Sequence, residues 1–153
     1  MKLSAADQTT YPLFANYVKT SLPKLITIPK IVTAVGRYGA LDRAAFQRAI
    51  SWGVAPNIII TDLHAGQCGV PRAYGCFRRA RPENIEIHIG TVLDFELSAK
   101  ADRNLAGKSV YVVGASLLHE LCDWGNFNHV PTIPELREMG AAFELEVYGK
   151  VIY

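Results

Sequence analysis

The sequence has no long hydrophobic run, little net charge and few cysteines. No apolar run approaches the roughly 18 residues that a membrane-spanning helix needs. The first seven residues, MKLSAAD, lack the hydrophobic centre of a signal peptide. The formal net charge of +2 is too small to indicate a nucleic-acid partner. We therefore expect no membrane partner, no nucleic-acid partner and no signal peptide of the chain's own.

The three cysteines are an odd number, so at least one has no partner within the chain. Cys68 and Cys76 flank a turn-rich stretch that could fold back and bring the two sulfurs together. Two free thiols are nevertheless the favoured expectation, because proteins made in the cytosol seldom keep disulfides. Cys122 follows Leu118 and Leu121 in an apolar segment, which indicates a small buried packing residue.

What is present is the composition of a globular protein, with 50% hydrophobic and 20% charged residues. We expect a single domain over residues 1–153, because this length supports one core. The patterns predict an α+β fold with N-terminal helices and a small mixed β-sheet. The expected helices cover residues 11–22 (ended by Pro23), 28–38, 41–50 and 91–99, and the expected strands cover 57–63, 73–77 and 84–89. Strand 84–89 alternates as a half-buried or edge strand does, and residues 101–108 are expected to be a loop.

The segment after these elements combines an apolar run with a motif typical of metal sites. Residues 109–124 predict a helix that contains His119, Glu120 and Asp123. Residues four apart share one helix face, so His119 and Asp123 can point at the same spot, with Glu120 about 100° away around the axis. This is the layout of a zinc-peptidase helix, in which two side chains hold the metal and the Glu activates a water. The usual second ligand is His, and here it is Asp123.

Two segments of the chain offer a third protein ligand for the metal. Residues 125–131 predict a turn, and residues 133–148 predict a second, ligand-bearing helix. This helix could return Glu144 to the site, because small Gly140 would allow close approach, with Glu138 as the second choice. Alternatively, His129 stands ten residues after His119, as in zincins that use three histidines.

These donors indicate a hydrolase that depends on Zn²⁺ or another divalent metal. The metal would activate a water, and Glu120 would act as general base towards an amide bond. Asp123 adds negative charge to the metal shell compared with His, so slower chemistry or a different metal preference is expected.

Several blocks of the chain resemble one known family. They include Tyr11-Pro12, Ser51-Trp52-Gly53, Leu118-His119-Glu120-Leu121, Trp124-Gly125-Asn126 and the segment from Glu138 to Gly149. Together they resemble the zincin-like metallopeptidase toxin domains of bacterial polymorphic toxins, in particular the third such metallopeptidase toxin family. On this resemblance, the first metal His falls on His119, the catalytic Glu on Glu120 and the third-ligand segment on 138–144. The second metal His of the family falls on Asp123.

The resemblance also implies a biological setting. It implies the C-terminal effector domain of a larger secreted carrier polypeptide, delivered into a target cell. It further implies a protein or peptide substrate and a cognate immunity protein in the producing cell. Two alternatives stay open: a catalytically impaired zincin-fold toxin that acts by binding a target, and a peptidoglycan amide hydrolase.

Overall fold

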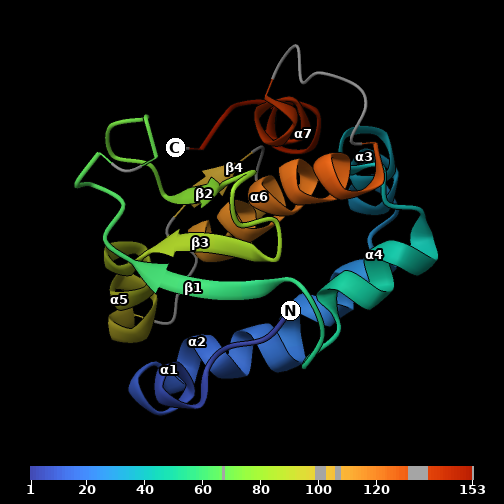
Figure 1. Cartoon of the computed structure of the whole chain (residues 1–153). Coiled ribbons are helices and arrows are strands. Elements are labelled where there is room, and N and C mark those ends of the chain that lie inside the picture. Colours follow the sequence, from blue (N-terminus) through green and yellow to red (C-terminus); the bar gives the residue numbers. More distant parts are fainter. Residues whose placement is uncertain (67, 99–102, 106–107, 131–137, 153) are drawn as a thin grey trace.

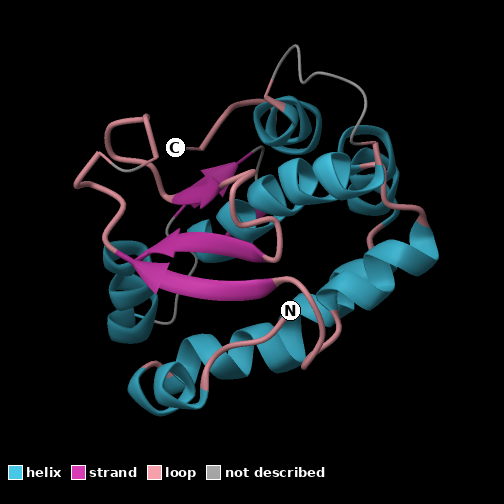
Figure 2. Cartoon of the chain, viewed as in Figure 1, coloured by secondary structure: helices cyan, strands magenta, loops and turns pink. Residues whose placement is uncertain are grey.

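A computed structural model describes residues 1–66, 68–98, 103–105, 108–130 and 138–152. Within these residues the fold is α+β, as predicted, with seven α-helices and a small mixed sheet (Figures 1 and 2). No helix in this part of the chain is both long enough and apolar enough to cross a membrane.

The main sheet has three strands in the order β1-β3-β2 (β1 Asn57–Thr61, β2 Gly75–Phe77, β3 Asn84–His88). β1 is parallel to β3, and β2 is antiparallel to β3. β3 is therefore the central strand, and the expectation of a half-buried or edge strand was wrong. Its polar residues alternate as predicted, but Glu86 is buried, and its carboxylate accepts a hydrogen bond of 2.8 Å from Nε of Arg78.

Helices form the N-terminal third of the chain. They are α1 (Ala5–Thr10), α2 (Pro12–Asn16), the π-helix η1 (Tyr17–Ser21), the 3-10 helix η2 (Leu22–Thr27), α3 (Pro29–Gly39) and α4 (Arg43–Ile50). Pro23 does not end the helical stretch as predicted. It lies in the first turn of η2, where its missing N–H has no partner to lose.

The C-terminal part contains the two helices that matter most for the site. After α5 (Ile89–Ser98), the strands β4 (Arg103–Leu105) and β5 (Lys108–Val110) pair antiparallel. The loop expected over 101–108 was therefore wrong for 103–105 and 108, and its other residues lie outside the described part of the chain. α6 (Val112–His129) and α7 (Met139–Tyr148) follow. α6 lies against β2 and β3, with α3 and α7 packed beside it (Figure 1). The predicted start of the second helix, at 133, lies outside the described residues.

The predicted turn at 125–131 was wrong as far as His129, because α6 continues through Gly125. A Cβ on Gly125 would lie 2.3 Å from the carbonyl oxygen of Gly39 and 2.8 Å from Cγ of Leu41. The glycine is therefore explained by close helix packing and not by turn geometry. Cys122 is buried at the same crossing, as expected of a small packing residue.

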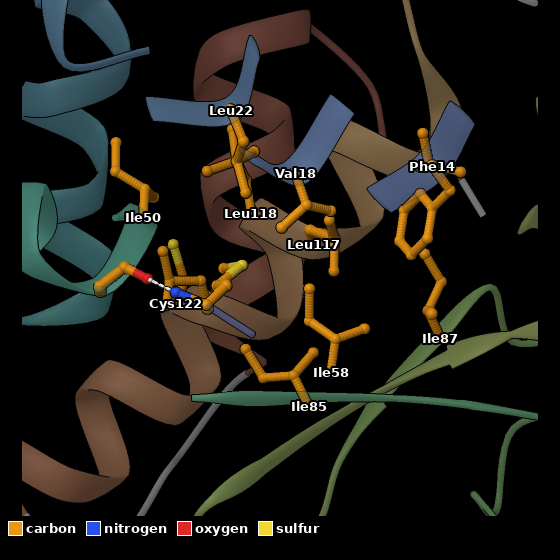
Figure 3. Close-up of a cluster of buried hydrophobic side chains, with 14 of the residues drawn as sticks. Phe14, Val18, Leu22, Ile50, Ile58, Ile85, Ile87, Leu117, Leu118 and Cys122 are labelled. Atoms are coloured by element: carbon orange, nitrogen blue, oxygen red, sulfur yellow. Dashed lines mark hydrogen bonds between the residues drawn. The ribbon is translucent and has the colours of Figure 1, made fainter. Parts of the chain in front are cut away.

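The main hydrophobic core lies between the sheet and the helices. Ile58, Ile85 and Ile87 of the sheet face Val18 of η1 and Leu117 of α6 in this core (Figure 3). Consequently, the helix that carries the predicted metal motif is fixed by apolar contacts along its other side.

Cys68 and Cys76 form a disulfide, so the expectation of two free thiols was wrong. The segment between them folds back and places the Cα atoms 6.0 Å apart, a separation typical of a disulfide. Cys122 is the free cysteine.

Candidate active site

The motif residues of α6 lie together in a buried position. His119, Glu120 and Asp123 each offer a ligand atom, and these atoms all lie within 4.8 Å of one another. All three side chains are buried, although each carries a titratable group. Buried charges need partners, so the neighbours of each side chain indicate its role.

His119 is held between two carboxylates of the α7 segment. Its Nδ1 lies 2.9 Å from Oε1 of Glu144, and its Nε2 lies 2.7 Å from Oε1 of Glu138. Both glutamates that the sequence offered as third ligands therefore reach His119, but at opposite nitrogens. Glu138 lies on the same side of the ring as Asp123, whose Oδ2 is 3.8 Å from Nε2 of His119.

Glu144 uses both of its carboxylate oxygens within the protein. Oε1 faces His119, and Oε2 accepts a hydrogen bond from the backbone N–H of Ile152. The side chain is buried. This arrangement suits a residue that orients the imidazole, since histidines that bind metals commonly donate their other ring N–H to a carboxylate.

Asp123 connects the two helices. Its Oδ1 accepts hydrogen bonds of 3.0 Å from the backbone N–H groups of Met139 and Gly140, at the start of α7. These N–H groups have no partner within their own helix. A carboxylate oxygen can accept both hydrogen bonds, whereas a histidine nitrogen has one lone pair. Asp at this position therefore fastens α7 to α6, and its other oxygen faces His119.

Two glycines allow this close packing. A Cβ on Gly140 would lie 2.1 Å from Cδ2 of His119, and a Cβ on Gly75 of β2 would lie 2.7 Å from Oε1 of Glu120. The close approach that the sequence predicted for Gly140 is thus confirmed. Gly75 was not predicted, because its neighbour in space is 45 residues away in the sequence.

The electrostatics of the group reflect an excess of carboxylates. Burial lowers the pKa of His119, but hydrogen bonds to Glu138 and Glu144 outweigh this effect and raise the pKa to about 11. Burial raises the pKa of Glu120 to about 8, against the opposing effect of His119. One imidazolium therefore faces four carboxyl groups, those of Glu120, Asp123, Glu138 and Glu144.

The donor set fits a divalent cation. The imidazole nitrogen of His119 and the carboxylate oxygens of Asp123 and Glu138 are legitimate ligands for Zn²⁺ or Mn²⁺. An added cation would also balance the surplus of carboxylates around His119.

The group lies in a cleft of about 210 Å³ between α6, the start of α7 and the segment leading into β2. The sequence missed the residues of this last wall. They are Cys68, Val70, Ala73, Tyr74, Gly75, Cys76, Phe77 and Arg79. No local pattern marks them, because they come to the cleft through the pairing of β2 with β3 and through the Cys68–Cys76 disulfide.

His129 does not join the cluster. It lies on α6 ten residues beyond His119, which corresponds to roughly 15 Å along a helix axis. Its Nδ1 lies 2.9 Å from the carbonyl oxygen of Gly125, and its ring packs against Trp124.

A second group of donors, Asp62, His64 and His88, lies at the end of β1. Nδ1 of His88 accepts a hydrogen bond of 3.2 Å from the N–H of Leu63, and Oδ1 of Asp62 accepts one of 2.9 Å from the N–H of His64. The His64 and His88 rings stack at 3.6 Å. These contacts close the turn after β1, so the group has a structural explanation.

Comparison with known proteins gives one result. No curated protein and no solved structure matches the chain. The family model described as metallopeptidase toxin 3 matches residues 7–149, which include the whole cluster around His119. The chain therefore belongs to the metallopeptidase toxin 3 family.

Proposed function

We propose that the domain is a peptidase toxin that depends on a divalent metal and hydrolyses an amide bond. The observation that carries this proposal is that Nε2 of His119 lies 2.7 Å from Oε1 of Glu138 and 3.8 Å from Oδ2 of Asp123, beside the buried Glu120. The family supports metallopeptidase chemistry in general, and the geometry supports a role for each residue.

His119, Asp123 and Glu138 would hold the metal. The sequence favoured Glu144 as third ligand, but both of its oxygens are engaged by His119 and Ile152. We therefore assign Glu138 to the metal and Glu144 to the orientation of His119. The bound ion would supply Lewis acidity towards the scissile carbonyl and the attacking water.

Glu120 would act as the general base. It would accept the proton of the attacking water and return it to the leaving nitrogen. Burial raises the pKa of the Glu120 carboxyl, and a base with a raised pKa holds the transferred proton more readily. Gly75 leaves space for the Glu120 carboxylate directly beneath β2.

Two carboxylates and one imidazole form a harder ligand set than three histidines. We propose Zn²⁺ as the metal, with Mn²⁺ as the ion that such oxygen donors also accept. The proposed fold is zincin-like, since a helix bearing His-Glu packs against the sheet and a following segment would supply the third ligand.

The family match supports a proposal for the biological setting. We propose that residues 1–153 form a single effector domain of a larger secreted carrier, delivered into a target cell. A cell that makes an active peptidase needs an inhibitor, so a cognate immunity protein is the expected partner, and a protein or peptide is the expected substrate.

The test compares the wild type with Glu120→Gln. The variant should lose about 10²–10⁴-fold in peptide hydrolysis and should lose toxicity, yet retain the metal in elemental analysis. Glu83→Gln, an exposed glutamate, is the matched control and should leave both activities unchanged.

Two outcomes would redirect the proposal. A Glu120→Gln variant that is as toxic as the wild type would support a toxin that acts by binding a target. Hydrolysis of cell-wall peptide amides, without hydrolysis of proteins, would support a peptidoglycan amide hydrolase.

A further inference from the structure

One wall of the cleft is closed by a disulfide. The segment from Cys68 to Cys76 contributes Cys68, Val70, Ala73, Tyr74, Gly75 and Cys76 to the lining. The Cys68–Cys76 bond joins the two ends of this segment. The wall on the other side is formed by α6, by Glu138 just before α7 and by Glu144 of α7, and it includes the proposed metal ligands His119, Asp123 and Glu138.

The C-terminal end of this wall is anchored independently of the disulfide. The carbonyl of Tyr74 accepts a hydrogen bond of 2.8 Å from the N–H of His88, and β2 continues this pairing with β3. The Tyr74 side chain packs against Val112, Ala115 and Ile152. Gly75, which leaves room for Glu120, is therefore held by sheet pairing and by the packing of Tyr74.

The N-terminal end of the wall has much weaker support. Cys68 packs on a small cluster of Leu63, Ala73 and Cys76, which is separate from the main core. Residues 69–72 form no helix or strand, and Gly69 and Arg72 both have positive φ. The disulfide is the covalent link that ties this end of the wall to β2.

We propose that the Cys68–Cys76 disulfide is a positioning element for substrate, so that the cleft binds substrate fully only when these thiols are oxidised. This inference rests on the proposed peptidase function. The proposed metal ligands lie on α6 and just before α7, and the Glu120 side chain lies against the sheet-anchored Gly75. Reduction would therefore weaken substrate binding and spare both the metal and the chemical step.

A small disulfide compound, such as oxidised glutathione, can oxidise the Cys68 and Cys76 thiols. The two thiols lose two electrons and two protons as the bond between their sulfurs forms. The disulfide of the oxidant breaks and becomes two thiols. Oxidising compartments permit this exchange and the cytosol opposes it. The domain would thus bind its substrate more tightly outside the reducing cytosol than within it.

The test uses the double variant Cys68→Ala/Cys76→Ala rather than a thiol reductant, because thiols bind metals. With dye-labelled casein as the probe, KM should rise roughly tenfold, while kcat stays within about twofold. The metal content per chain should equal that of the wild type. Cys122→Ala, which keeps the disulfide and removes a buried thiol, is the control for general destabilisation and should leave KM unchanged.

A second measurement does not depend on peptidase activity. Trypsin should cut after exposed Arg72 at least tenfold faster in the double variant, as judged by mass spectrometry of the fragments. An unchanged KM together with an unchanged rate of cleavage at Arg72 would overturn the inference. A fall in kcat or in metal content would also overturn it, since the disulfide would then support the whole site.

The failure of the underlying function looks different. If the wild type holds metal but never cleaves casein or any peptide, the proposed peptidase activity is wrong. In that case the rate of trypsin cleavage after Arg72 alone decides whether the disulfide positions this wall of the cleft.

Discussion

The two sides of α6 are both buried but hold opposite kinds of side chain. Leu117, Leu121 and Cys122 pack into the main core, whereas His119 and Asp123 face the cleft. The first side is stabilised by the removal of apolar surface from water. The second side is stabilised by hydrogen bonds and opposite charges, because ionised groups are otherwise costly to bury. One helix therefore holds a charged site rigidly without exposing it widely to water.

The largest effect on folding stability is expected from a substitution on the apolar side of α6. Leu117→Ala would leave a cavity at a fully buried position and should lower the free energy of unfolding by about 2–5 kcal/mol. The metal affinity of the folded protein should change little, because Leu117 does not line the cleft. Chemical denaturation and metal titration measure the two effects separately.

Leu145→Ala removes the same atoms from an exposed position on α7 and is the matched control. Its effect on unfolding should be far smaller. Equal destabilisation by the two variants would mean that the apolar side of α6 does not hold the helix.

The next largest effect is expected from a substitution that crowds the polar side of α6, and it should appear as weaker metal binding. Gly140→Ala places a methyl group against the His119 ring, so His119 or α7 must move. We expect metal binding to weaken by about 1–3 kcal/mol, measured as a shift in the dissociation constant.

Gly149→Ala provides the contrast. Gly149 ends α7 with φ of 80° and has open space around it. This variant should cost roughly 1 kcal/mol in folding stability and leave metal affinity unchanged. The assignment of His119 to the metal fails if both glycine variants bind metal as the wild type does.

A subtler change tests the role of Glu144. Glu144→Gln keeps the size of the side chain but weakens its hold on Nδ1 of His119, so metal affinity should fall about 10–100-fold. Glu138→Gln removes a proposed ligand directly and should cost more. The reverse order of these two effects would make Glu144 the metal ligand and Glu138 its support.

The smallest effect is expected at His129. His129→Ala should leave the metal dissociation constant within about twofold of the wild type, because His129 lies three turns beyond His119 on α6. Loss of metal in this variant would revive the three-histidine arrangement.

Local patterns predicted the helices and strands better than their ends. The spacing of His119 and Asp123 and the small size of Gly140 correctly indicated that two helices meet at this site. The end of α6 was missed, because Gly125 resembles a turn residue until its contact with Gly39 is known. Local turn chemistry was overridden by a packing contact between segments far apart in the sequence.

The partners of His119 were equally hard to read from sequence. Whether Glu138 or Glu144 lies beside Asp123 depends on where α7 begins, and the carboxylate of Asp123 binds the N–H groups at that point. The disulfide was missed for a different reason. Its formation was judged from the cellular compartment, whereas the fold of the segment brings the cysteines together.

The contact between Gly39 and Cys122 has a consequence for dissecting the domain. A Cβ on Gly39 would lie 3.2 Å from Cα of Cys122, so the backbones of α3 and α6 nearly touch. A fragment that starts after Ala40 lacks α3 and would expose the apolar side of α6. We expect it to be insoluble and inactive. The same contact predicts that the domain can be split into two fragments, residues 1–40 and 41–153. Each fragment expressed alone should be inactive, and co-expression of the two should restore the activity.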